Sequence, residues 1–127
     1  MMNDDALSVP QIAYRQREVE GELQSAPRLI KDAAEHVVFC QRTLNTARAK
    51  AAMEAGEAYL KAKTVAEKDR LLWSATVKEW EDLQLAEIAL NYARDTFKAS
   101  QAELMSLGSR LKAANESDRA HARYGGG

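Results

Sequence analysis

Residues 83–114 read LQLAEIALNYARDTFKASQAELMSLGSRLKAA. Large apolar side chains recur every seven residues along this stretch, at Leu83, Leu90, Phe97, Leu104 and Leu111. A second row, three residues further on, holds mostly smaller side chains, at Ala86, Ala93, Ser100, Leu107 and Ala114. Two rows that stay in register over this many heptads are typical of a coiled coil with a left-handed supercoil.

The first half of the chain keeps the same seven-residue register. One row consists of Leu23, Ile30, Val37, Leu44, Ala51 and Ala58, and the other of Ile12, Val19, Ala26, Ala33, Cys40 and Ala47. We call these four rows the seam. Small side chains in one row let two helix backbones approach, while larger side chains fill the space beside them. The sequence therefore predicts two long helices that pack along each other.

A short turn joins these helices. The segment Thr64-Val65-Ala66-Glu67 has the pattern of a capping box, which marks the start of a helix. We therefore predict an all-α fold, a long antiparallel helical hairpin (coiled coil) with arms at about 9–63 and 65–114 and a turn at 63–64. In this register the facing pairs are Leu44 with Leu83, Val37 with Leu90, Ile30 with Phe97, and Leu23 with Leu104.

The ends of the chain lack the heptad pattern. We expect a disordered N-terminus at 1–8, a single hairpin domain at 9–114 and a flexible C-terminal tail at 115–127. The region from Ser25 to Pro27 leaves two alternatives open. One is a short N-terminal third helix that folds back on the hairpin, and the other is a continuous helix kinked at Pro27.

Composition excludes several classes of protein. Between residues 28 and 124 there is no proline and the only glycines are Gly56 and Gly108, too few turn signals for a sandwich, barrel or doubly wound sheet. The net charge is -1, and no apolar run is long enough to span a membrane. The N-terminus has no signal-peptide pattern, and Cys40 is the only cysteine, so we expect a cytoplasmic protein without an intrachain disulfide.

No motif for chemistry is present. The chain has no phosphate loop, no nucleophile elbow and no Glu-x-x-His pair for a di-metal site. Asp32, His36 and Cys40 share one helical face, but Cys40 is also a seam position, and we interpret it as a packing residue. We therefore expect no enzyme activity, no catalytic or metal-binding residues and no cofactor.

A second apolar stripe lies off the seam, toward the turn. We predict that it forms an oligomer or partner interface, with Phe39, Met53, Leu60, Trp73, Val77, Trp80, Ile88 and Tyr92 as its residues. Large exposed apolar patches usually mark partner surfaces. We therefore expect a homo-oligomer, such as an antiparallel four-helix dimer or a larger bundle, with the turn-end apolar face also open to a protein partner. An intramolecular bundle with the third helix is the alternative.

Nucleic-acid binding is the second functional hypothesis. The basic and aromatic residues that would contact it lie at the turn and in the tail: Lys61, Lys63, Lys68, Arg70, Arg119, Arg123 and Tyr124. Lysine and arginine neutralise phosphates, and an aromatic ring stacks on a base. Neighbouring acidic residues dilute both clusters. The balanced polar faces also argue against a helix that lies on a membrane.

The stretch 63–114 resembles small Ala-rich helical accessory proteins of phages and prophages of high-GC bacteria. The features that suggest this resemblance are TVAEKDRLLW at 64–73, the Ala/Leu heptads and, beyond that stretch, RYGGG at 123–127. This resemblance implies a non-catalytic role in a bacterial host cell, in genome replication or recombination, in virion assembly, or in countering host defence. We thus expect a non-catalytic, self-associating scaffold or interaction protein. The alternatives are an accessory nucleic-acid-binding protein in replication or recombination, and an inhibitor or sponge that acts against host defence.

Overall fold

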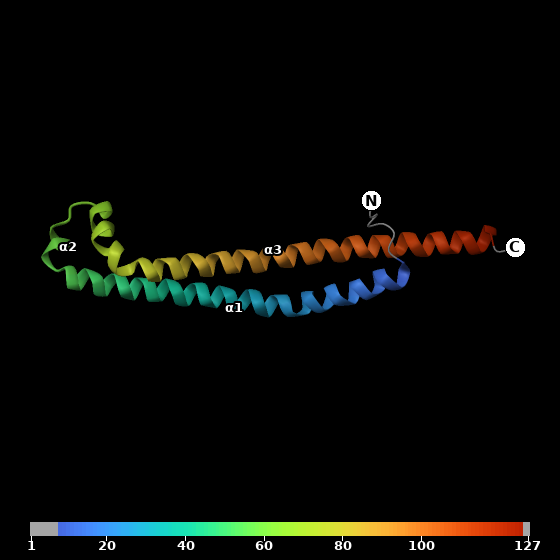
Figure 1. Cartoon of the computed structure of the whole chain (residues 1–127), viewed down its shortest axis with the longest axis horizontal. Coiled ribbons are helices and arrows are strands. Elements are labelled where there is room, and N and C mark those ends of the chain that lie inside the picture. Colours follow the sequence, from blue (N-terminus) through green and yellow to red (C-terminus); the bar gives the residue numbers. More distant parts are fainter. Residues whose placement is uncertain (1–7, 126–127) are drawn as a thin grey trace. The chain divides into compact units, whose positions relative to one another are not determined.

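The computed structural model describes residues 8–125, and the side chains of residues 8–121. This part of the chain contains three α-helices and no strand: α1 (Val9–Ala55), α2 (Glu57–Lys61) and α3 (Val65–Gly125) (Figure 1). The two long helices pack against each other and run in opposite directions. The protein is an all-α helical hairpin, which confirms the predicted fold class.

The chain divides into two compact units, to which both long helices contribute. The turn unit comprises residues 29–93, that is, the second part of α1, all of α2 and the first part of α3. The terminal unit is formed by residues 1–28 and 94–127, of which 8–28 and 94–125 are described.

The core of the turn unit is a cluster of four buried side chains, Cys40, Leu44, Leu83 and Ala86, with Val37 packed against them. Two members come from α1 and two from α3. Leu44 and Leu83 were predicted to face each other, and both lie in this cluster. Burial of apolar surface stabilises a fold by about 25 cal/mol per Å², so these seam residues hold the two helices together here.

The core of the terminal unit consists of Ile12, Val19 and Leu107, with Leu23, Leu104 and Leu111 packed against them. Val19 is 0% exposed, whereas the other buried apolar residues of the chain retain 3–9% of their accessible surface. Leu23 and Leu104, a predicted facing pair, both contact this cluster. A core this thin leaves most apolar side chains at least partly accessible.

The predicted seam is confirmed almost throughout. Every seam position is buried or half-buried except Ala58, which is exposed. Two further residues of α3 continue the buried surface toward the turn, Leu72 and Thr76. The hydroxyl of Thr76 donates a hydrogen bond of 2.8 Å to the Leu72 carbonyl, so the polar group is satisfied although it is buried.

The first arm ends earlier than predicted, because α1 stops at Ala55 and not near residue 63. Gly56 follows with φ 57° and ψ -123°, a conformation that favours glycine because it has no Cβ. The short helix α2 then leads to Ala62, whose N–H donates to the Tyr59 carbonyl. The break at Gly56 takes Ala58 out of the seam.

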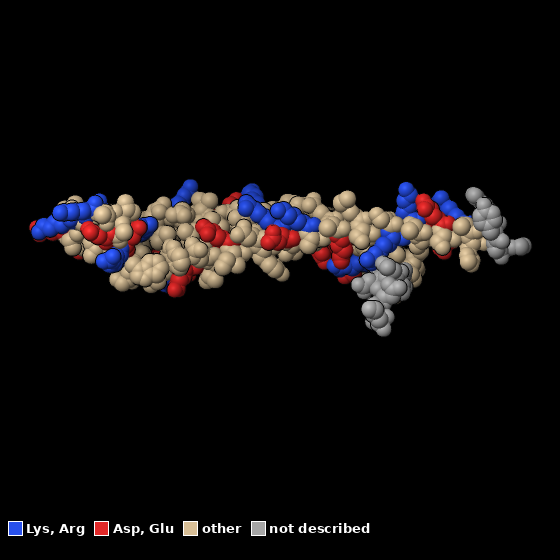
Figure 2. Space-filling view, turned by 90° about the horizontal axis from the view of Figure 1, so that it is seen from above, with Lys and Arg blue, Asp and Glu red and all other residues tan. Residues whose placement is uncertain are grey.

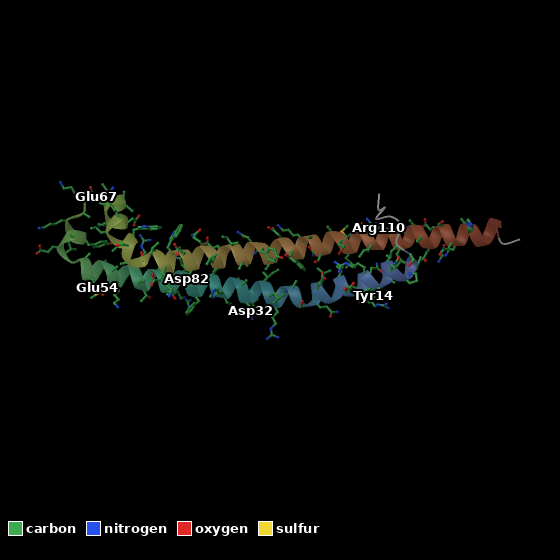
Figure 3. All side chains as sticks on the ribbon, in the orientation of Figure 1. Tyr14, Asp32, Glu54, Glu67, Asp82 and Arg110 are labelled. Carbon is green, nitrogen blue, oxygen red and sulfur yellow. The ribbon has the colours of Figure 1, made fainter. Side chains whose placement is uncertain are left out.

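The predicted capping box at the start of α3 is confirmed. The Glu67 N–H donates to the Thr64 hydroxyl at 3.1 Å. The Glu67 carboxylate reaches back and accepts a 2.9 Å hydrogen bond from the Lys63 N–H. Figure 3 labels Glu67 beside the turn. These two contacts satisfy backbone donors that a helix start leaves without intrahelical partners.

The sequence predicted disorder over residues 1–8, and this is wrong for Ser8, which is placed at the start of α1. Residues 1–7 lie outside the described part of the chain. Ser8 and Gln11 form a second capping box at the start of α1. The Ser8 N–H donates to Gln11 Oε1 at 2.8 Å, and the Gln11 N–H donates to the Ser8 hydroxyl at 3.3 Å. The pattern S-x-x-Q was a readable signal for this start.

Of the two alternatives left open around Pro27, the structure has the single continuous helix, and the C-terminal segment is helical beyond the predicted end of the hairpin. The helix α1 is continuous through Pro27, whose missing N–H removes one backbone hydrogen bond. At the other end, α3 extends to Gly125, beyond the predicted limit at Ala114; residues 126 and 127 lie outside the description. No glycine or proline lies between residues 109 and 124, so nothing in this segment breaks the helix.

Candidate protein interface

Side chains beside the seam of the turn unit fall on two opposite flanks. A helix advances about 100° per residue, so the residues before and after a seam position lie on opposite sides of it. Because α1 and α3 are antiparallel, the preceding residues of both helices share one flank and the following residues share the other. We call these the Phe39 flank, with His36, Phe39, Thr43, Asp82, Leu85 and Ala89, and the Trp flank, with Arg48, Trp73, Val77 and Trp80.

The Trp flank is centred on two aromatic side chains of α3. Trp73 and Trp80 contact each other edge to face, with ring centroids 5.3 Å apart and an interplanar angle of 61°. Both are substantially exposed, at 50% and 41%. A small pocket of about 150 Å³ lies between them and α1, and an ion pair between Arg48 and Asp69 contributes to its lining.

The Phe39 flank carries a larger groove, of about 440 Å³. Its lining residues come from both long helices: His36, Phe39, Cys40, Thr43, Glu79, Asp82, Leu85, Ala86 and Ala89. The His36 and Phe39 rings are stacked, with centroids 6.2 Å apart. The His36 Nε2 atom lies 3.6 Å from the buried Cys40 thiol.

Seven of the eight predicted interface residues are exposed, and Val77 is half-buried. They do not form one patch. Trp73, Val77 and Trp80 share the Trp flank, whereas Phe39 lies on the opposite flank. Tyr92 precedes the seam position Ala93 and so lies on the side of the Phe39 flank, but it does not line the groove there. The remaining three lie on neither flank: Met53, Leu60 and Ile88. The sequence reasoning missed Glu79 and Asp82 of the groove, although their i, i+3 spacing on one helix was a readable signal.

The predicted basic cluster at the turn is partly engaged within the chain. Lys61 Nζ lies 3.6 Å from the Glu57 carboxylate, and Lys68 Nζ lies 5.2 Å from the centre of the Tyr59 ring. Lys63 and Arg70 are exposed. On the face shown in Figure 2, basic side chains lie next to acidic ones. The turn therefore presents a mixed surface and not a basic strip on that face.

Of the three predicted nucleic-acid residues of the tail, only Arg119 has a side chain in the described part of the structure. Arg119 is exposed and lines a shallow depression on α3 with Gly108 and Leu111. Arg123 and Tyr124 belong to α3, but their side chains lie outside the described part.

Within residues 8–121, no group of three or more His, Cys, Asp or Glu side chains is arranged to hold a metal ion. Asp32, His36 and Cys40 therefore form no metal site, and the His36–Cys40 contact stands as part of the groove wall. None of the helices described is both long and apolar enough to cross a membrane.

Comparison of the chain with models of protein families, with curated proteins and with solved structures found no match.

Proposed function

We propose that this protein is a non-catalytic helical scaffold that self-associates through the Trp flank of its turn unit. The observation that carries the proposal is the pair Trp73 and Trp80, two large exposed rings in mutual contact on one flank. Tryptophan is enriched at protein interfaces and dominates their binding energy. Within residues 8–125, the two packed helices have no further layer to cover such a flank.

The spacing of the two rings suits a symmetric contact between copies. Trp73 and Trp80 are seven residues apart, so they lie on the same side of α3, two turns from each other. If a second copy packs antiparallel on this flank with the two-fold axis midway between the two rings, Trp73 of each copy lies against Trp80 of the other. Most homo-oligomers use such isologous interfaces, in which one patch complements itself.

The charges on this flank do not oppose self-association. Arg48 and Asp69 pair with each other beside Trp73, so both charges are already compensated within the chain. Burial of an unpaired charge would be strongly unfavourable, and burial of a compensated pair much less so. Two Trp flanks therefore meet without repulsion at the centre of the contact.

Light scattering after size-exclusion chromatography tests this function at tens of micromolar. We expect the wild-type chain to be a dimer or larger, and Trp80→Glu to be a monomer with unchanged helical circular dichroism. The matched control is Met105→Glu, which puts the same charge on an exposed apolar position of the terminal unit. A monomeric wild type would overturn the proposal. An oligomeric Trp80→Glu variant would show that the interface does not lie on the Trp flank.

The resemblance to phage accessory proteins supports a setting for this scaffold in the cytoplasm of a bacterial host. The resemblance implies a role in virion assembly, in genome replication or recombination, or in countering host defence. The neighbouring genes distinguish the first two: a portal or capsid gene supports virion assembly, and a recombinase or helicase gene supports replication.

A further inference from the structure

The groove on the Phe39 flank differs in chemistry from the Trp flank. Small side chains contribute to its lining, those of the buried Cys40 and Ala86 and of the exposed Ala89. Phe39 and Leu85 form walls and are 63% and 64% exposed. The His36 ring supports the Phe39 wall by stacking on it at 15°. Small residues between two large ones on adjacent helices leave room for the side chains of a third helix.

Two carboxylates lie along the same groove. Glu79 is half-buried at a position in register with the seam, and Asp82 is exposed where α3 runs beside α1 (Figure 3). Neither carboxylate makes a hydrogen bond or an ion pair with any other residue in the described part of the chain. Asp82 is not paired with Lys78 either, although Lys78 lies one turn before it on α3. A half-buried carboxylate without a partner is unfavourable, so a cation brought into this groove would be stabilised.

We propose that this groove binds an amphipathic helix of a partner protein, which places apolar side chains between Phe39 and Leu85 and a lysine or arginine against Glu79 and Asp82. The groove between two antiparallel helices is where a third helix packs in a bundle, and helix-in-groove recognition uses such apolar anchors. The two carboxylates select a basic helix over an acidic one.

A second copy of this chain is a poorer occupant than a basic helix. Two Phe39 flanks that face each other would bring four uncompensated carboxylates into one interface. Like charges in a partly desolvated contact are strongly unfavourable. The partner site is therefore separate from the self-association surface on the Trp flank, and either one can exist without the other.

Fluorescence anisotropy with labelled synthetic peptides tests the partner site on the full chain. The basic probe has three LKKLLKL repeats, and the matched acidic probe has three LEELLEL repeats. We expect the basic peptide to bind and the acidic peptide to bind at least about tenfold more weakly, as charge complementarity requires. The variant Trp80→Ser, which we expect to remove self-association, should bind the basic peptide as the wild type does.

Substitutions locate the binding surface. The double variant Glu79→Gln/Asp82→Asn should weaken binding of the basic peptide by about tenfold or more, because charge-assisted contacts are lost. Leu85→Ser should weaken it through loss of a wall. The control Glu81→Gln/Glu87→Gln changes the net charge equally at exposed positions off the groove and should have little effect.

Three results would each overturn the proposal. They are equal binding of the two peptides, an equal loss in the groove and control double variants, and failure of the basic peptide to bind. None of them bears on the self-association of the wild-type chain, which light scattering measures separately.

Discussion

Arg15 and Glu103 form a bidentate ion pair between α1 and α3 in the terminal unit. Arg15 Nε donates to Glu103 Oε1 at 3.0 Å, and Arg15 Nη2 donates to Glu103 Oε2 at 2.8 Å. Glu22 lies 3.5 Å from the same guanidinium. The hydrogen bond to Glu103 raises the pKa of Arg15 above its ordinary value, with smaller contributions from the nearby carboxylates. Two parallel hydrogen bonds require a defined alignment, so this pair sets the local register of the two helices.

Substitution of either partner should weaken the terminal unit in a non-additive way. We expect Arg15→Ala and Glu103→Gln each to lower the urea midpoint of unfolding, and the double variant to be no worse than Arg15→Ala. The guanidinium is accessible to water, so the effect is small and should shrink in high salt. Additive losses in the double-mutant cycle would show that the pair does not interact in solution.

Gly56 and Gly21 should respond to alanine with opposite signs. Gly56 has φ 57°, whereas Gly21 is inside α1 with nothing within 4 Å of an added Cβ. Gly56→Ala should therefore destabilise the chain by about 1–3 kcal/mol through backbone strain. Gly21→Ala should stabilise it by about 0.5–1 kcal/mol. Chemical denaturation measures both, and a neutral Gly56→Ala would contradict the helix break.

Ala86 tests the close approach of the helices in the turn unit. It is 3% exposed and belongs to the buried cluster with Leu83. Ala86→Leu should destabilise the chain by about 1–3 kcal/mol because a larger side chain disturbs the packing of Ala86 against the buried cluster between the two helices. The control Ala102→Leu lies at an exposed helical position and should change stability by less than about 0.5 kcal/mol. Similar results for both would argue against close packing at Ala86.

Thr64 caps the N-terminus of α3, and its substitution should destabilise the first turn of that helix. Thr64→Ala loses the hydrogen bond from the Glu67 N–H and should cost about 1 kcal/mol. Thr64→Ser keeps a hydroxyl at the same place and should retain most of the stability. Amide hydrogen exchange across residues 65–68 provides the local readout. Unchanged exchange in Thr64→Ala would show that the cap is not formed in solution.

The sequence alone was sufficient for the hairpin and for its seam. Every position of the heptad rows except Ala58 is buried or half-buried, and Leu44 lies in one cluster with Leu83 as predicted, because helical periodicity is a local property of the chain. The capping box at Thr64 was likewise readable, since its two hydrogen bonds join residues at most four positions apart.

The end of α1 at Ala55 could not be predicted from the local sequence. A single glycine costs a helix only about 1 kcal/mol, and Gly21 and Gly108 are both accommodated inside long helices. What distinguishes Gly56 is that the chain must reverse its direction there, and only the packing of α1 on α3 requires this. The residues around Gly56 are good helix formers, so their propensities predicted a longer first arm.

The two flanks mark the limit of what the sequence determined by itself. The sequence showed which apolar residues lie outside the seam, because that depends only on spacing along one helix. Which of them share a surface depends on the antiparallel pairing of two distant segments. That pairing sets Phe39 beside Leu85 and the unpaired Asp82, and leaves Trp73 and Trp80 together on the opposite side. Only the tertiary structure therefore separated one expected interface into two surfaces with different chemistry.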